Sequence, residues 1–282
     1  MLTLLAFLIK LHENLRRFDN KTNSYIKNSN EKNIHDVRTS IRRFNAAFLI
    51  LPKRYRKGCL LSDYNQLANK FFRVNSELRD MDIIQEKLNA YPQTDQRNIV
   101  IDLLKKNRQS NLEGAKTIAL SLKNMNSNKI LDKMDITEKE LQKRYNKLLF
   151  ELISKIETNF LIVITNTLKI KELHELRKDC KKLKYILELL VKDNNNKNKN
   201  NIAMGLIKTL QNIQDILGSI RDYDITIDYL KKLEPSKEIQ EIVNNEIEQR
   251  RLKYEEFLRF CKRRLHISRD SFFARIKSLP SS

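Results

Sequence analysis

The chain of 282 residues carries 55 Lys and Arg against 35 Asp and Glu, a formal net charge of +20. So large a cationic excess indicates a polyanionic partner, and nucleic acid, an anionic membrane and inorganic polyphosphate are the candidates. Gly and Pro number only four each, too few for the turns of Rossmann folds, P-loops, sandwiches and barrels. Because 40% of the residues are apolar, a packed core is feasible, and we expect an all-α chain of one large domain or two small ones.

The cysteines and histidines predict neither a disulfide framework nor a metal site. The three cysteines and four histidines are far apart in sequence, without C-x-x-C or H-E-x-x-H spacing. The apolar start, Met1–Ile9, lacks the basic region and cleavage site of a signal peptide, and no apolar run approaches the length of a membrane span. We therefore expect a soluble protein in a reducing, intracellular compartment, with no metal and no other cofactor.

Apolar periodicity predicts helices in chain order, beginning with one over Leu4–Leu15. The following predicted helices cover residues 33–51, 60–89, 96–123, 141–164, 172–191, 202–232 and 237–265. Pro92 and Pro235 mark joints between helices, because the residue before a proline disfavours the helical conformation. Two segments rich in Asn and Lys are expected to connect the halves (Lys123–Asp135) and to form an exposed loop (Asp193–Asn201).

Two motifs occur twice, in the same order. Residues 35–50 read HDVRTSIRRFNAAFLI, and residues 174–189, at an offset of 139, read HELRKDCKKLKYILEL. The sequence R-D-x-D-I stands at Arg79–Ile83 and again at Arg221–Ile225, at an offset of 142. Two motifs at nearly one offset indicate an internal duplication. We expect a single domain, 1–282, built from a repeat at 1–130 and a repeat at 136–282.

Each H-x-x-R segment predicts a helix with a basic stripe beside an apolar one, at 100° per residue. The basic stripe is His35, Arg38 and Arg42 in the first copy and His174, Arg177 and Lys181 in the second. The core-facing residues are Val37, Ile41, Phe44 and Phe48, and then Leu176, Cys180, Leu183 and Leu187. A solvated face is the ordinary interpretation of a basic helix. The same geometry occurring twice at a core boundary favours a shared anion instead, because facing cations repel each other.

The histidines and aspartates of the motifs each have two interpretations. A helical histidine is most often a hydrogen-bonded structural residue. Here nearby cations should lower its pKa, so that the neutral ring could donate to a phosphate oxygen or to a carboxylate. The aspartates of R-D-x-D could bind a divalent metal, but we favour a structural role in which they pair with arginines of the basic stripe, since catalytic metal sites usually need more converging carboxylates. These aspartates are Asp80, Asp82, Asp222 and Asp224.

These motifs resemble the conserved-histidine α-helical domain, the CHAD family, over essentially the whole chain. The second copy matches better, because the first has Asn45-Ala46 where the second has Lys184-Tyr185, and Asn75-Ser76 where the second has Leu217-Gly218. The resemblance implies two four-helix bundles related by a pseudo-twofold axis around a central basic cleft or pore. It also implies binding of inorganic polyphosphate without hydrolysis. Some members carry a CYTH triphosphatase domain; we interpret the CYTH-like sequence at Glu246–Arg250 as a chance match on a solvated helix face.

We therefore predict a non-catalytic polyphosphate-binding protein with no catalytic or metal-binding residue, acting through multivalent electrostatics. The predicted binding residues are His35, Arg38, Arg42, Arg43, Arg79, His174, Arg177, Lys181, Lys182, Lys184 and Arg221. We expect a cytoplasmic location, with polyphosphate granules as one candidate place, and no membrane binding. A polyphosphate-metabolising enzyme is a candidate partner.

Alternatives stay open at this point. A nucleic-acid-binding helical protein fits the charge, although stacking aromatics and a helix-turn-helix spacing are not evident. A phosphohydrolase would need metal-binding carboxylates or an activated nucleophile. The chain could also be an accessory module of a polyphosphate- or triphosphate-processing enzyme, or a scaffold for an acidic protein or membrane surface; the position of the stripe beside the core argues against the scaffold.

Overall fold

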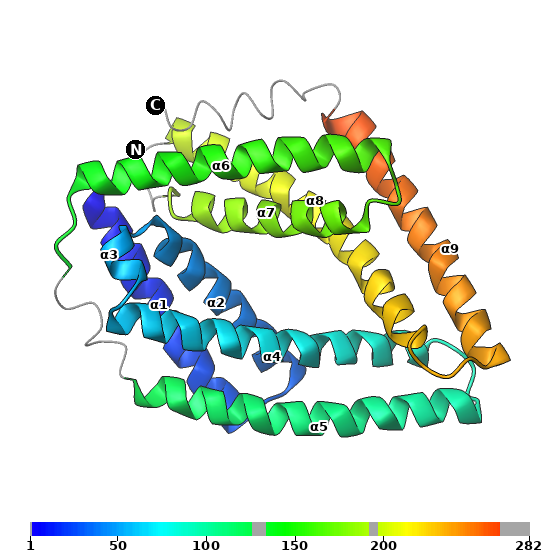
Figure 1. Cartoon of the computed structure of the whole chain (residues 1–282). Coiled ribbons are helices and arrows are strands. Elements are labelled where there is room, and N and C mark those ends of the chain that lie inside the picture. The colour runs from blue at the N-terminus through cyan, green and yellow to red at the C-terminus, as the bar shows by residue number, and fades with distance from the viewer. Residues whose placement is uncertain (1, 126–133, 192–196, 266–282) are drawn as a thin grey trace.

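The structure, a computed structural model, describes residues 2–125, 134–191 and 197–265, and every regular element in these ranges is helical. The all-α prediction is confirmed. The helices are α1 (Leu4–Lys27), α2 (Glu31–Ile50), α3 (Lys53–Arg56), α4 (Leu60–Asn89), α5 (Asp95–Asn124), α6 (Glu138–Thr165), α7 (Ile170–Glu188), α8 (Lys197–Leu230) and α9 (Lys237–Phe260), followed by a π-helical turn, Cys261–Leu265 (Figure 1).

The predicted helices agree with these bounds to within a few residues at most ends, and the predicted joints at Pro92 and Pro235 are confirmed. The first helix is longer than predicted, because Phe18, Thr22 and Tyr25 continue its buried stripe. The short helix α3 was not predicted.

The structure describes only parts of the two segments rich in Asn and Lys that were predicted to be connections. α8 begins at Lys197, so the loop predicted over Asp193–Asn201 is wrong for residues 197–201. Its residues 193–196 lie outside the described part of the chain, as do residues 126–133 of the predicted connection between the halves.

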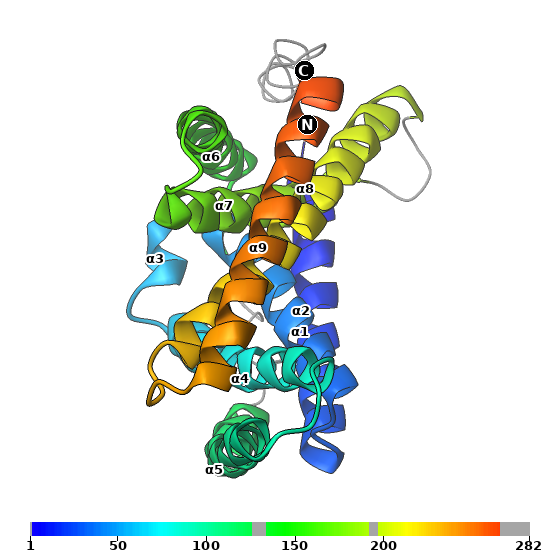
Figure 2. The ribbon, with the colours of Figure 1, turned by 90° about the vertical axis from the view of Figure 1, so that its right-hand side faces the viewer.

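The helices with basic stripes lie inside the molecule. In both views α5 and α6 lie at opposite ends, with α2 and α7 between them (Figure 1, Figure 2). α2 contacts α1, α4, α6 and α7, while α7 contacts α6 and α8 as well. The larger apolar cluster contains fully buried residues from both halves, such as Phe44 and Leu183. A smaller cluster, including Leu88 and Ile242, joins the ends of the α4–α5 and α8–α9 hairpins.

Corresponding helices of the two hairpins begin with the same kind of cap. Thr94 and Ser236 precede α5 and α9, and their side chains accept hydrogen bonds from the backbone N–H groups of Arg97 and Ile239 at 3.3 and 3.2 Å. The two caps are 142 residues apart, the same offset as the R-D-x-D motifs. The R-D-x-D motif and the following helix cap are therefore separated by the same number of residues in the α4–α5 and α8–α9 hairpins.

The CYTH-like segment does not lie on a solvated face. Glu246 is 4% exposed, accepts a hydrogen bond from the Tyr91 hydroxyl at 2.8 Å and pairs with Lys87 at 2.8 Å. Arg250 is paired with Asp224. The solvated-face interpretation is thus wrong for these two residues, which connect α9 to α4 and α8. None of the described helices is both long and apolar enough to cross a membrane.

Replacing Ser236 by Ala removes the α9 cap, and we expect this to lower the free energy of unfolding by about 1 kcal/mol. Ser110→Ala, at an exposed position inside α5, is the matched control and should leave stability unchanged or slightly raised, because Ala favours a helix interior. Chemical denaturation of both variants measures the difference. An equal loss in the two variants would contradict a capping role.

Candidate anion-binding site

Two amphipathic helices, one from each repeat, position the site. α2 and α7 contact each other, and all the residues predicted to face the core on both helices are buried. This burial fixes the rotation of each helix about its axis, so the neighbouring basic stripes lie at the edge of the core. At the start of α2, the side chain of Asn30 accepts the backbone N–H of Asn33 at 2.9 Å.

A cavity of about 430 Å³ lies between α2, α7 and α8. Predicted binding residues from both repeats line it, namely His35, Arg42, Arg43, Arg177, Lys181 and Lys184. The remaining lining residues are Thr39, Tyr185, Gln211, Gln214, Asp215, Gly218, Ser219 and Asp222. The predicted meeting of the two stripes at one hollow is therefore present, and its role in binding stays a prediction.

Arg38 and Arg221 lie next to the cavity rather than on its lining. Arg38 and Arg42 both lie over the ring of Phe72 on α4, with guanidinium carbons 5.7 and 5.0 Å from its centroid. Arg221 donates two hydrogen bonds to Asp80, at 3.0 and 2.9 Å, and so joins α8 to α4. Burial and the positive charge of the neighbouring Arg42 lower the pKa of Arg38 to about 9. The two guanidinium groups are therefore close enough to repel each other.

Three predicted binding residues have other partners. His174 Nε2 lies 3.0 Å from Asp224 Oδ2. Lys182 is exposed and donates to Asp179 at 3.3 Å, while Arg79 pairs with Glu31 at 3.4 Å. The two motif histidines therefore differ, because His35 lines the cavity and His174 holds a carboxylate.

Four of the cations have no ion pair in the described part of the chain. These are Arg38, Arg42, Arg177 and Lys181, and burial and neighbouring cations lower the pKa of each, while Asp80 and Asp222 partly offset this at Arg38 and Arg177. Burial and Arg221 lower the pKa of Arg177 to about 10. Burial, together with Arg42 and Arg177, lowers the pKa of Lys181 to about 6. We call Arg38, Arg42, Arg177 and Lys181 the unpaired cation group.

The donors of this group are also unsatisfied. The Nε–H groups of Arg38 and Arg177 are buried without an acceptor in the described structure. A buried donor without an acceptor costs about 1–3 kcal/mol, and more when it is charged. The free protein therefore holds two buried guanidinium donors without an acceptor, and one of them belongs to Arg177, which lines the cavity.

His35 behaves as predicted from its cationic surroundings. Burial and the charges of Arg38 and Arg42 lower its pKa below the usual value, so the ring is neutral at pH 7. Its Nε2 lies 3.5 Å from the Thr39 hydroxyl. A neutral ring adds a hydrogen-bond donor to the cavity without adding to the repulsion there.

Three of the four R-D-x-D aspartates pair with arginines other than those of the stripe. Asp80 binds Arg221, Asp82 binds Arg108 at 2.6 Å, and Asp224 binds Arg250. The predicted pairing with stripe arginines is therefore wrong for these three, whereas the charge of Asp222 acts on the stripe residue Arg177 in the direction that raises its pKa. The second aspartate of each motif points to the following helix, so it holds a hairpin together. No group of three or more His, Cys, Asp and Glu that could hold a metal occurs among the residues described.

Sequence reasoning missed the contribution of α8 to the lining. Gln211, Gln214, Gly218 and Asp222 follow one another at intervals of three and four residues, so they form one face of α8. That spacing was visible in the sequence, but nothing in it showed that this face meets α7. A Cβ at Gly218 would lie 3.6 Å from Nη2 of Arg177, so the guanidinium rests against the helix where no side chain projects.

Comparisons with known proteins identify the family and the fold of the chain. The model of the CHAD domain family matches residues 10–231. The chain belongs to the CHAD family. A solved CHAD domain structure from the plant Ricinus communis is similar, with a TM-score of 0.61 and 15% identity over 97% of this chain and 91% of that one. This likeness shows a common fold. No curated protein sequence matches the chain.

Replacing Arg38 by Met should stabilise the free protein by about 1–3 kcal/mol, because an apolar side chain of similar length removes a buried cation that lacks a partner. Met can keep the contact with the ring of Phe72. The measurement is the midpoint of thermal unfolding without added anion. The exposed Arg16→Met, on α1, is the control and should change stability by less than about 0.5 kcal/mol. A loss of stability in Arg38→Met would show that Arg38 is satisfied in the free protein.

Proposed function

We propose that this CHAD-family protein binds inorganic polyphosphate, without cleaving it, in the cavity between α2, α7 and α8. The observation that carries the proposal is the unpaired cation group, of which Arg42, Arg177 and Lys181 line one cavity and Arg38 lies beside Arg42 on the ring of Phe72. Polyphosphate presents charged oxygens at every unit, and a guanidinium can hold two oxygens of one phosphate. A chain of linked phosphates could therefore neutralise several of these cations at once.

The size of the cavity favours a chain over a single ion. Its volume of about 430 Å³ is roughly fourteen times the ~30 Å³ that one water occupies in the liquid. Several linked phosphate groups need such a space, and the cations stand on two helices instead of around one point. Lys184 and Arg43 add further positive charge at its edge.

We also infer that the chain is one domain of two pseudo-twofold-related four-helix bundles, with repeats at 1–130 and 136–282. Two contacts between counterpart helices support this, α2 with α7 and α4 with α8. In an arrangement with a twofold axis, a helix contacts its counterpart from the other half next to that axis, as in an isologous interface. The cleft would then lie near the axis, where both stripes reach it. A cytoplasmic location at polyphosphate granules, and a polyphosphate-metabolising enzyme as partner, would follow from such a ligand.

Reversing one cation from each repeat tests the proposal. Arg38→Glu combined with Arg177→Glu should abolish retention on immobilised polyphosphate at physiological salt, because each change removes an attraction and adds a repulsion. The control combines Arg16→Glu with Lys178→Glu, two exposed positions with the same change in net charge, and should be retained nearly as wild type. Circular dichroism establishes that both proteins are folded. Retention of a folded Arg38→Glu, Arg177→Glu protein would overturn the site assignment.

Two alternatives are separated by simple measurements. If the chain is a nucleic-acid-binding protein, duplex DNA or RNA should displace polyphosphate efficiently; the proposal expects poor displacement at equal phosphate concentration. If it is a hydrolase, orthophosphate should appear in the presence of Mg²⁺ or Mn²⁺. A steep fall in polyphosphate affinity with rising salt is expected in any case, by analogy with counterion release from nucleic acids.

Binding should take up a proton because of Lys181. In the free protein the pKa of Lys181 is about 6, so the amine is mostly neutral at pH 7, and a bound phosphate favours the charged form and raises this pKa. Affinity should therefore fall as pH rises above about 6, by at most tenfold per unit. Calorimetry in buffers of different ionisation enthalpy measures the uptake. Lys181→Met should lose this component, while titration of the ligand's terminal phosphates affects both proteins; identical pH profiles would contradict the assignment.

A further inference from the structure

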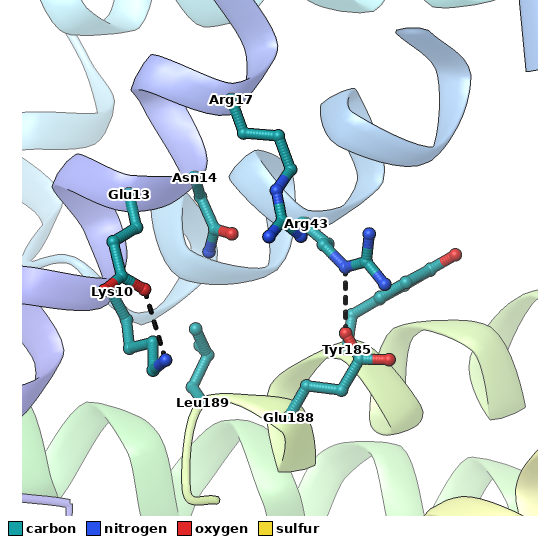
Figure 3. Close-up of a pocket in the computed structure, with 8 residues that line it drawn as sticks. All are labelled: Lys10, Glu13, Asn14, Arg17, Arg43, Tyr185, Glu188 and Leu189. Atoms are coloured by element: carbon teal, nitrogen blue, oxygen red, sulfur yellow. Dashed lines mark hydrogen bonds and ion pairs between the residues drawn. The ribbon is translucent and has the colours of Figure 1, made fainter. Parts of the chain in front are cut away.

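A second cavity, of about 150 Å³, shares Arg43 and Tyr185 with the first. Its other lining residues come from α1 and from the end of α7 (Figure 3). They are Lys10, Glu13, Asn14, Arg17, Glu188 and Leu189. None of the α1 residues belongs to the duplicated motifs, so the two cavities combine repeated and non-repeated parts of the chain.

One cation of the second cavity has no counterion in the described structure. Lys10 is paired with Glu13 at 3.1 Å, and Arg43 with Glu188 at 3.0 Å. Arg17 has no ion pair among the described residues. Arg17 and Arg43 extend from α1 and α2 into the same space (Figure 3). The two carboxylates that line it, Glu13 and Glu188, are paired with Lys10 and Arg43, so the charge of Arg17 is not matched there.

Glu188 stands between the two sets of cations. Its carboxylate accepts a hydrogen bond from Arg43 and also lies 4.0 Å from Lys184, which lines the first cavity. Arg43 lies over the ring of Tyr185, 5.7 Å from its centroid. Glu188 thus supplies, from within the protein, the negative charge that a ligand phosphate would supply at this junction.

We propose that the second cavity is a further phosphate subsite, which receives a polyphosphate chain too long for the first cavity. The chain passes Tyr185, takes the place of Glu188 on Arg43 and reaches Arg17 and Lys10. The inference rests on the proposed function and adds a preference for long chains to it. It assigns a binding role to α1, which the duplicated motifs do not include.

The test compares two ligands on the full-length protein, tripolyphosphate and a long-chain polyphosphate, at one salt concentration. Arg17→Glu should weaken binding of the long chain by roughly three- to tenfold, as expected for reversing an exposed charge beside an anion. Its effect on tripolyphosphate should be less than about twofold. Arg16→Glu is the matched control, since Arg16 is the adjacent exposed arginine outside both cavities. Equal effects of the two variants on the long chain would overturn the subsite.

Glu188→Gln tests the same subsite in the opposite direction. Removing the internal carboxylate should raise the ratio of long-chain to tripolyphosphate affinity by roughly three- to tenfold. Glu175→Gln, at a half-buried position whose carboxylate is paired with Lys178 on the same helix, is the control and should leave the ratio unchanged. A ratio that stays constant or falls in Glu188→Gln would contradict the displacement of Glu188.

The two proposals fail in different ways. If the wild-type protein binds neither ligand, the proposed function is wrong. If it binds both, and Arg17→Glu behaves like Arg16→Glu, only the second subsite is wrong.

Discussion

Repulsion among cations held close together, and only partly relieved by acidic neighbours, is the constraint on which this molecule depends. Apolar burial of α2 and α7 leaves each helix one orientation, and that orientation brings both basic stripes to the same side of the core. In a low-dielectric setting, like charges cost more than they would in water. The lowered pKa values of Lys181 and Arg38 show this cost in the free protein.

Several contacts reduce the free-energy cost of this repulsion without removing it. The ring of Phe72 receives two guanidinium groups, and such contacts contribute about 0.5–2 kcal/mol each. The Asp80–Arg221 bridge neutralises one cation close to the group and ties the two hairpins together. Asp222 lines the cavity, but burial raises its pKa, which weakens it as a counterion. Positive charge therefore stays without an ion pair beside the cavity, at the expense of some stability.

Much of this arrangement followed from the sequence, since helical periodicity and internal repetition are local signals. The bounds of α4, the core faces of α2 and α7, and the lowered pKa of His35 were all predictable from spacing and composition. What could not be predicted depends on how helices approach one another. The sequence showed no reason why Asp82 should bind Arg108 instead of a stripe arginine, or why α8 should line the cavity. The partnership of His174 with Asp224 likewise depends on the tilt of α8 against α7.

The two sequence repeats differ in one detail beside the basic stripes. Gly218 lets Arg177 lie against α8, whereas the matching residue of the first copy is Ser76 on α4, whose hydroxyl bonds to the carbonyl of Phe72. An unbranched phosphate polymer has the same chemical structure from either end. A ligand without polarity, held in a trough whose walls differ, has two equivalent directions of entry. If the protein binds polyphosphate as proposed, its asymmetry would set which segment of the polymer is held most firmly, and the polymer could lie in either direction.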